Sequence, residues 1–236
     1  MTTGPEYPVS LSKFLSICGV ASRRKATELI KNEKVFVNSE LITQPGYKVT
    51  EKDIVKYNNK VIQYGKRYYI LLNKPRGYVC TNEDKYADKK AVDLIDIPDS
   101  RLFTAGRLDK ESEGMIIVTN DGDYAKKLTH PSYQTTKTYH VTVDRELSKK
   151  NLSDFQNGIT DDGEFLKAQS VKAIGRNKYE FVLTQGKNRE IRRMISYAKR
   201  KTIKLKRIAI GRLSLDKLPQ GKWRSLSSAE IELTLK

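Results

Sequence analysis

The feature that most constrains the fold is the apolar run GMIIVT at residues 114–119, which directly follows the polar loop sequence GRLDKESEG. A run that is continuously apolar, and does not alternate with polar residues, is typical of a strand that is covered on both faces. Such a strand needs strand neighbours on both sides and further layers above and below it. The sequence therefore predicts a domain built around a sheet with residues 114–119 near its centre.

The segments around this run are mostly strand-like. Expected strands cover residues 68–75, 136–143, 167–174 and 178–184, and expected helices cover residues 123–130 and 188–201. Strands outnumber helices, and the two do not alternate regularly, so a doubly wound nucleotide-binding fold is disfavoured. We expect an α+β domain over residues 68–236 with a mixed, mainly antiparallel sheet flanked by helices.

Residues 8–63 form a separate unit of two short helices and several short β-prone segments, and QYGKR at 63–67 is the expected hinge. Gly19 ends the first helix and Ser22 caps the second. Arg23, Arg24 and Lys25 then fall in the first turn of the second helix, where the helix dipole disfavours cations. Either an external anion binds there, or the helix start is simply solvated.

The charge of the chain points to a polyanionic partner. Lys and Arg total 45 against 28 Asp and Glu, a formal net charge of +17. Eleven of these cations and a single acid, Glu190, lie within residues 187–212, and the interleaved Ile, Leu and Met are typical of a folded segment. We interpret this basic block as a nucleic-acid footprint, although a solvated helix face would also be basic.

Several classes of protein are disfavoured by missing patterns. No apolar run approaches the ~20 residues of a membrane span, and the N-terminus does not resemble a signal peptide, so a cytoplasmic protein is expected. Two cysteines, and His130 and His140 without partners at ligand spacing, predict no metal site. Phosphate-binding and dinucleotide-binding glycine motifs are absent, so no cofactor is expected.

Asp109 is the strongest candidate for a reacting group. Its loop is bounded by Gly106 and Gly114, carries Arg107, and precedes the buried strand. Clefts form where buried strands end, and a guanidinium near a carboxylate keeps it ionised and able to act as a nucleophile. From the spacing alone, however, an arginine-leucine-aspartate triplet is more often a surface salt bridge or the start of a turn.

The motif resolves these alternatives when it is taken together with the rest of the chain. GRLDKESEGMIIVTNDG resembles the catalytic motif of the RsuA-type pseudouridine synthases. LLNKPRGYVC, KTYHV, LTQGKNREIRRM and LKRIAIGRLSLDKLPQGKWRSL resemble four further motifs of that family, in the family's order. SRRKATELIKNEKVFVN resembles an S4 (αL-like) RNA-binding domain. The resemblance covers nearly the whole chain, with Glu190 and Met115 as small departures from the residues common in the family.

The resemblance implies a site and a partner. Asp109 would be the catalytic carboxylate, Tyr139 would stack on the target uracil, and Arg192 would pair with Asp109. Uridine would be everted from the RNA and isomerised without a metal or cofactor. The cations expected to contact RNA are Arg23, Arg24, Lys25, Arg107, Lys187, Arg189, Arg193, Lys204 and Arg207.

Two motifs, QGKNREIRRM and LPQGKWRSL, are most similar to the large-subunit branch of the family, particularly its S4-containing F-type members. We therefore expect 23S ribosomal RNA as substrate and a monomeric enzyme. Two other functions remain open from the residues. A non-catalytic RNA-binding ribosome assembly factor would not need Asp109 and Arg192 together. A glycosylase or nuclease would release uracil or cleave the chain.

Overall fold

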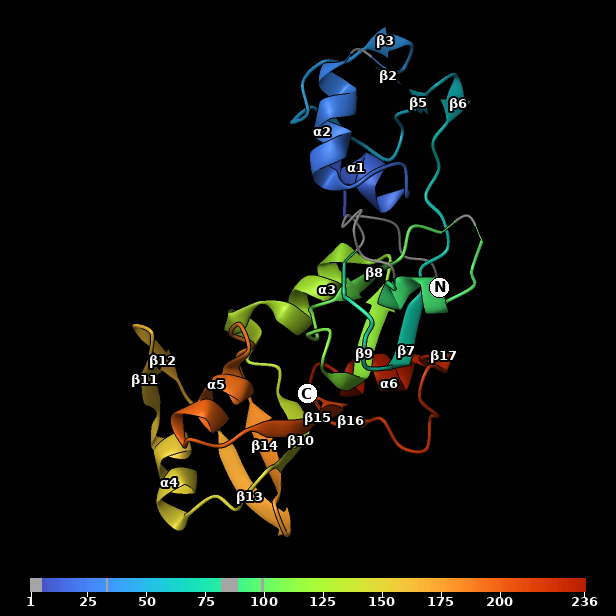
Figure 1. The fold of residues 1–236 in the computed structure, drawn as a ribbon. Helices are drawn as coiled ribbons and strands as arrows, with labels where there is room; N and C mark the ends of the chain where they lie inside the picture. Colours follow the sequence, from blue (N-terminus) through green and yellow to red (C-terminus); the bar gives the residue numbers. More distant parts are fainter. Residues whose placement is uncertain (1–5, 33, 82–88, 99) are drawn as a thin grey trace. The chain divides into compact units, whose positions relative to one another are not determined.

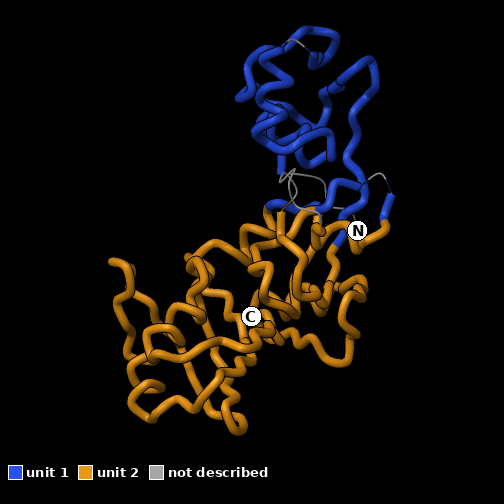
Figure 2. The backbone as a smooth tube through the Cα atoms, in the orientation of Figure 1, with its two compact units in different colours: residues 1–68, 97–102, 120–122 blue, residues 69–96, 103–119, 123–236 orange. Residues whose placement is uncertain are grey.

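The computed structural model describes residues 6–32, 34–81, 89–98 and 100–236, which divide into two compact units. Unit 1 holds residues 1–68 together with the short segments 97–102 and 120–122, and unit 2 holds the remainder (Figure 2). Segment 120–122 joins unit 1 through Asn120, whose side chain accepts from Tyr68 N at 2.9 Å and donates to the carbonyl of Lys66 at 2.8 Å. Asp121 in the same segment forms an ion pair with Arg67.

Unit 1 combines two helices with short antiparallel strands (Figure 1). Its elements are β1 (Val9–Ser10), α1 (Leu11–Ile17), α2 (Arg23–Lys31), β2 (Val35–Val37), β3 (Glu40–Leu41), β4 (Lys48–Val49), β5 (Val55–Tyr57) and β6 (Lys60–Val61). β1 pairs with β4, and the other four strands form a sheet in the order β3-β2-β5-β6. The hairpins β2–β3 and β5–β6 turn through two-residue loops with positive φ at both positions, as tight hairpins require.

The helices of unit 1 begin and end close to where the sequence predicts. Ser22 is the N-cap of α2 and its hydroxyl accepts from Lys25 N at 3.3 Å, and Gly19, after α1, has a φ of +81°. The buried faces of both helices, with Leu11, Leu15 and Ile30 fully buried, pack on the strands.

Unit 2 is built on a nine-stranded sheet whose main path runs β13-β14-β10-β15-β9-β7-β17, with β16 on β15 and β8 on β9. The strands are β7 (Tyr69–Lys74), β8 (Phe103–Ala105), β9 (Glu113–Thr119), β10 (Lys137–Val143), β13 (Ser170–Gly175), β14 (Lys178–Leu183), β15 (Thr202–Ile210), β16 (Leu213–Ser214) and β17 (Trp223–Ser225). The pair β9–β15 is parallel and the other pairs described in this sheet are antiparallel. This confirms the predicted α+β fold with a mixed, mainly antiparallel sheet.

Helices and a hairpin flank the sheet. They are the 3-10 turns η1 (Ala91–Leu94) and η2 (Pro131–Tyr133), the helices α3 (Gly122–Thr129), α4 (Lys149–Asn157), α5 (Glu190–Tyr197) and α6 (Ser228–Leu233), and the hairpin strands β11 (Ile159–Asp161) and β12 (Glu164–Leu166). β9 lies near the centre of the sheet, and its residues 115–118 are fully buried, as the continuous apolar run predicts. On one face, Met115 and Ile117 pack with Tyr124 and Leu128 of α3.

The basic block 187–212 differs from the long helix that the sequence predicts over residues 188–201. Helix α5 ends at Tyr197, because Lys199 adopts a left-handed φ of +54° and its N–H returns to the carbonyl of Ser196 at 2.8 Å. The chain then enters the long strand β15. The basic block is therefore a helix and a strand with separate environments. Helices α4 and α6, the hairpin β11–β12 and strand β17 were not predicted.

Candidate active site

Asp109 lies in a loop that joins the end of β8 to the start of β9. The glycines on either side have positive φ values, +81° at Gly106 and +103° at Gly114, which residues with a side chain rarely adopt. Within the loop, the N–H of Ser112 donates to the carbonyl of Asp109 at 2.9 Å, and Ser112 itself is buried. The loop is therefore a tight turn that presents Asp109 at a defined position beside the sheet.

The segment after β7 holds this loop in place. The N–H of Leu108 donates to the Sγ of Cys80 at 3.4 Å, and the N–H of Gly77 donates to the carbonyl of Lys110 at 2.7 Å. Lys74, which is fully buried, donates from Nζ to the carbonyls of Pro75 and Tyr78 at 2.9 and 2.8 Å. Burial lowers the pKa of Lys74. The asparagine-lysine-proline sequence thus organises a segment that supports the Asp109 loop.

Gly114 has a second role at the seam between β9 and β15. Its backbone is paired in parallel with Arg207, and a Cβ at this position would lie 2.3 Å from the carbonyl oxygen of Arg207. A glycine is therefore required both by φ and by the close approach of the two backbones. Gly114 thus ends the Asp109 loop and also allows β15 to lie against the start of β9.

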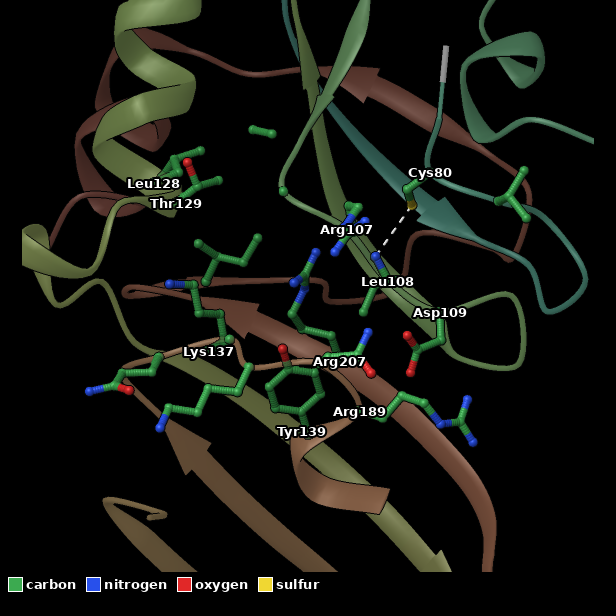
Figure 3. A pocket seen from close by; sticks show the side chains of 18 of the residues that line it. Cys80, Arg107, Leu108, Asp109, Leu128, Thr129, Lys137, Tyr139, Arg189 and Arg207 are labelled. Carbon is green, nitrogen blue, oxygen red and sulfur yellow. Dashed lines mark hydrogen bonds between the residues drawn. The ribbon is translucent and has the colours of Figure 1, made fainter. Parts of the chain in front are cut away.

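Asp109 and Tyr139 line two adjoining cavities, of about 610 Å³ and about 80 Å³. We call the two together the cleft. Figure 3 shows the side chain of Asp109 on one wall and the ring of Tyr139, from β10, on the opposite wall, with Lys137 and Arg207 beside it. Tyr139 is 8% exposed and is paired across the sheet with Phe181 and Arg207. The guanidinium carbon of Arg207 lies 6.0 Å from the centre of the Tyr139 ring.

Arg192, from α5, is next to Asp109. Its Nε lies 3.9 Å from Asp109 Oδ2, and its Nη2 donates to the carbonyl of Glu111 at 3.0 Å and the hydroxyl of Ser112 at 3.4 Å. Arg192 thus both faces the carboxylate and holds the far side of its loop. The Asp109 side chain is 32% exposed. The cleft is open in the described structure, and water reaches this side chain.

The cations expected to contact RNA fall into distinct environments. Arg107 and Arg189 are exposed at the cleft, which Lys187 also lines. Arg23, Arg24 and Lys25 are exposed in the first turn of α2, in unit 1. Lys187 donates from Nζ to the carbonyl of Phe165 and lies 3.9 Å from Glu164 Oε1. The other three candidates, Arg193, Lys204 and Arg207, also have partners within the protein.

Arg193 forms ion pairs with Asp161 and Glu164 of the β11–β12 hairpin, and Lys204 Nζ lies 3.0 Å from a carboxylate oxygen of Glu113. Arg207 is buried and donates from Nε to the carbonyl of Met115 at 2.7 Å. A phosphate contact from Arg193 or Lys204 would have to compete with these ion pairs, and their role in RNA binding stays a prediction.

Lys137 is a cleft residue that reasoning from the sequence missed. It lines the larger cavity from β10, two positions before Tyr139. Residues i and i+2 of a strand lie on the same face, so the alternation in KTYHV was the signal that could have found it. Cys80, beneath the loop, could not have been found in this way because its contact with Leu108 joins segments 28 positions apart.

Among the described residues, no three His, Cys, Asp or Glu side chains are grouped so that they could hold a metal ion. The described helices are also too short or too polar to cross a membrane. The cleft places a carboxylate and an aromatic ring among several cations, and the smaller unit exposes a basic helix start, an arrangement suited to a polyanionic ligand.

Comparison with known proteins identifies the family. Residues 68–197 match the RNA pseudouridylate synthase family and residues 9–55 match the S4 domain. The chain is 37% identical to an uncharacterized RNA pseudouridine synthase of Aquifex aeolicus, over 94% of this chain and 92% of the relative. It is 35% identical to the ribosomal large subunit pseudouridine synthase B of Bacillus subtilis, over 94% and 93%.

A third relative is the dual-specificity RNA pseudouridine synthase RluF of Escherichia coli, with 36% identity over 96% of this chain and 78% of the relative. A crystal structure of a pseudouridylate synthase superposes with a TM-score of 0.71 at 27% identity, covering 96% of this chain and 99% of that one. The chain belongs to the RsuA-type family of RNA pseudouridine synthases, with an N-terminal S4 domain, as the motifs predicted.

Proposed function

We propose that this enzyme isomerises a uridine of large-subunit, 23S ribosomal RNA and that Asp109 is its catalytic carboxylate. The large-subunit substrate follows the name of one relative, the ribosomal large subunit pseudouridine synthase B of Bacillus subtilis. The observation that carries the assignment of Asp109 is its position. It is the one carboxylate that lines both cavities among the described residues, and it lies opposite Tyr139 and 3.9 Å from Arg192.

The reaction needs no net change in atoms or electrons. The bond between C1′ of the ribose and N1 of uracil breaks, the base turns, and a bond forms between C1′ and C5. The proton on C5 leaves, and N1 gains one. Asp109 assists the departure of uracil, either by attacking C1′ or by removing the proton on C2′, and its place on the cleft wall is compatible with both routes.

The neighbours of Asp109 have complementary roles in this proposal. Arg192 faces the carboxylate and fixes its loop through Glu111 and Ser112. The target base is unavailable while it is stacked in RNA, so it is everted into the cleft. Stacking on Tyr139 contributes ~1–3 kcal/mol and offsets part of the eversion cost. Closure of RNA over the cleft also removes the water that now reaches Asp109.

RNA binding is divided between two regions. Residues 68–236 form the catalytic domain, where Arg107, Lys187 and Arg189 contact the backbone near the everted base. Residues 8–63 form the S4 domain, where Arg23, Arg24 and Lys25 supply a second basic surface on α2. We propose that the enzyme acts as a cytoplasmic monomer. Its affinity for RNA then falls steeply with salt, because each phosphate contact releases counterions.

Asp109→Asn tests the proposal most directly. The substrate is unmodified ribosomal RNA with tritium at C5 of uridine, and the readouts are tritium release and the affinity of the RNA. We expect the variant to bind RNA as the original chain does and to release no tritium, while the original chain releases tritium and leaves pseudouridine at a single mapped position. Tritium release by the variant would remove Asp109 from the mechanism.

The products give an independent check on the reaction. Free uracil would indicate a glycosylase, and shortened RNA a nuclease. Weaker RNA binding by Asp109→Asn, together with a lower unfolding temperature, would mean that Asp109 supports the fold and is not a reacting group. A parallel comparison of 16S and 23S ribosomal RNA as substrates tests the choice of subunit.

A further inference from the structure

Two cations lie side by side on the wall of the cleft that carries Tyr139. Lys137 and Tyr139 are on the same face of β10, and Arg207 is paired with Tyr139 across β15. Lys137 and Arg207 both line the larger cavity, and Figure 3 shows both side chains next to the Tyr139 ring. This wall therefore carries two cations beside the stacking ring.

Neither cation has a carboxylate partner in the part of the chain that the structure describes. Lys137 donates from Nζ to the carbonyl of Thr135 at 2.7 Å, and Arg207 donates from Nε to the carbonyl of Met115 at 2.7 Å. Arg207 is 4% exposed, and its Nη2 is buried without any hydrogen-bond partner. A buried donor without a partner is costly, so this group points to an acceptor that the free protein lacks.

The charges around the pair do not compensate it. The other charged side chains lining the larger cavity are those of Arg107, Asp109, Lys110, Lys187 and Arg189. Cys80 lines it as well, and burial raises the pKa of its thiol. Asp109 is thus the single carboxylate among the described residues of this cavity, and it lies on the opposite wall. Burial and the nearby Arg207 lower the pKa of Lys137 to about 8.

We propose that Lys137 and Arg207 together bind a backbone phosphate of the RNA substrate, deep in the cleft beside the everted uridine. This rests on the proposed function and names a contact of that site. Two desolvated cations require a full negative charge, which a phosphodiester carries and neutral uracil does not. Two residues of a strand span ~7 Å, about the length of a nucleotide unit. A phosphate held at Lys137 therefore fixes the nucleotide whose base stacks on Tyr139, with its sugar toward Asp109.

The test uses Lys137, because Arg207 also holds β9 through Met115 and its loss would disturb the fold. The full chain and the variants Lys137→Met and Lys137→Arg are titrated with a ribosomal RNA fragment between pH 6.5 and 9.5 and at several salt concentrations. Lys172→Met is the matched control, since Lys172 is exposed on β13 and does not line the cleft. Tritium release in single turnover at saturating RNA is measured alongside.

We expect Lys137→Met to weaken RNA binding about tenfold at pH 7 and to reduce the salt slope by about 0.7–0.9, the value of one phosphate contact. Its single-turnover rate should also fall, by no more than the roughly tenfold loss of affinity, because the phosphate contact positions the nucleotide against Asp109. The affinity of the original chain should fall as pH rises through about 8, where free Lys137 loses its proton, and Lys137→Arg should retain affinity at high pH. Lys172→Met should bind within about twofold and keep the original pH profile.

Two results would overturn the phosphate site. One is unchanged affinity and pH dependence in Lys137→Met. The other is unchanged affinity with a large loss of single-turnover rate, which would place the cation against the departing base instead. The failure of the proposed function looks different, because it appears as the absence of tritium release in the original chain, whatever the affinity of Lys137→Met.

Discussion

The two walls of the cleft are built from different kinds of contact. The wall with Asp109 is a tight loop held from below by the 75–80 segment, through Cys80 Sγ and the Lys110 carbonyl. The wall with Tyr139 is part of the sheet itself, where β10 and β15 place Lys137, Tyr139 and Arg207 by strand register. The first wall positions one anion with hydrogen bonds. The second positions cations and a ring surface by strand pairing.

This difference explains why each wall has charged side chains that are not needed to hold the wall together. The hydrogen bonds that hold the Asp109 loop, from Gly77 and Arg192 and to Cys80, involve its backbone and Ser112 and do not use the Asp109 carboxylate, which remains available for chemistry. On the other wall, pairing with β10 and β15 fixes the backbone whatever the side chains do, so cations can be left without acidic partners. A carboxylate and unpaired cations can then coexist in one cleft without neutralising each other.

Gly114→Ala should separate the two walls of the cleft, and we expect it to have the largest effect on stability and activity. A Cβ would lie 2.3 Å from the carbonyl of Arg207, and the φ of +103° is itself strained for alanine. Overpacking and a positive φ together predict a loss of roughly 3 kcal/mol or more in the free energy of unfolding, measured with denaturant. Tritium release should fall with it.

The control for this change is Gly122→Ala. A Cβ at Gly122 meets nothing within 4 Å, and its φ is not in the left-handed region. Its unfolding free energy should stay within about 1 kcal/mol of the original. Equal losses in both variants would mean that the seam between β9 and β15 is not tight.

Cys80→Ala should loosen only the wall with Asp109. The buried N–H of Leu108 loses its acceptor, which costs about 1–3 kcal/mol in the free energy of unfolding. Because Leu108 precedes Asp109, single-turnover tritium release should fall several-fold while RNA affinity stays unchanged. Cys80→Ser offers a hydroxyl oxygen to the same N–H and should recover part of both losses. A variant that loses RNA affinity instead would place Cys80 in the binding surface.

The two walls also differ in how far they could be predicted. The Asp109 loop is local in sequence, so its glycines, its aspartate and the buried strand after it indicated a site. Lys137 was not predicted as a site residue, because the cationic pair that it forms with Arg207, 70 positions later, depends on the register that pairs Tyr139 with Arg207. The end of α5 was missed because Lys199 adopts a left-handed conformation without being a glycine or asparagine. Strand pairing and such turns are decided by tertiary contacts.

Arg192 and Arg193 are adjacent in α5 but contact different partners. Arg193→Met should release the β11–β12 hairpin, which it holds through Asp161 and Glu164. We expect faster hydrogen exchange in residues 159–166, with the rate of tritium release nearly unchanged. Arg192→Met should show the reverse pattern, with a slow reaction and normal exchange in the hairpin. Identical behaviour of the two variants would contradict the separate roles.

Glu190→Gln should produce the smallest effect. It tests whether the acid that lines the smaller cavity lowers the stability of the folded protein. Glu190 is 4% exposed, and burial raises its pKa, although it accepts from Lys187 N at 3.1 Å. A raised pKa means that the folded state favours the protonated form, so stability falls as pH rises from the ordinary value of 4.5 through the raised one. Glutamine stays neutral and its oxygen can still accept from Lys187. The variant should therefore be more stable than the original chain at pH 7, with the gain vanishing below pH 4.5. A variant that unfolds more easily at pH 7 would show that the ionised carboxylate is stabilised by the basic start of α5. The cations at the start of α5 would then not all be available to RNA.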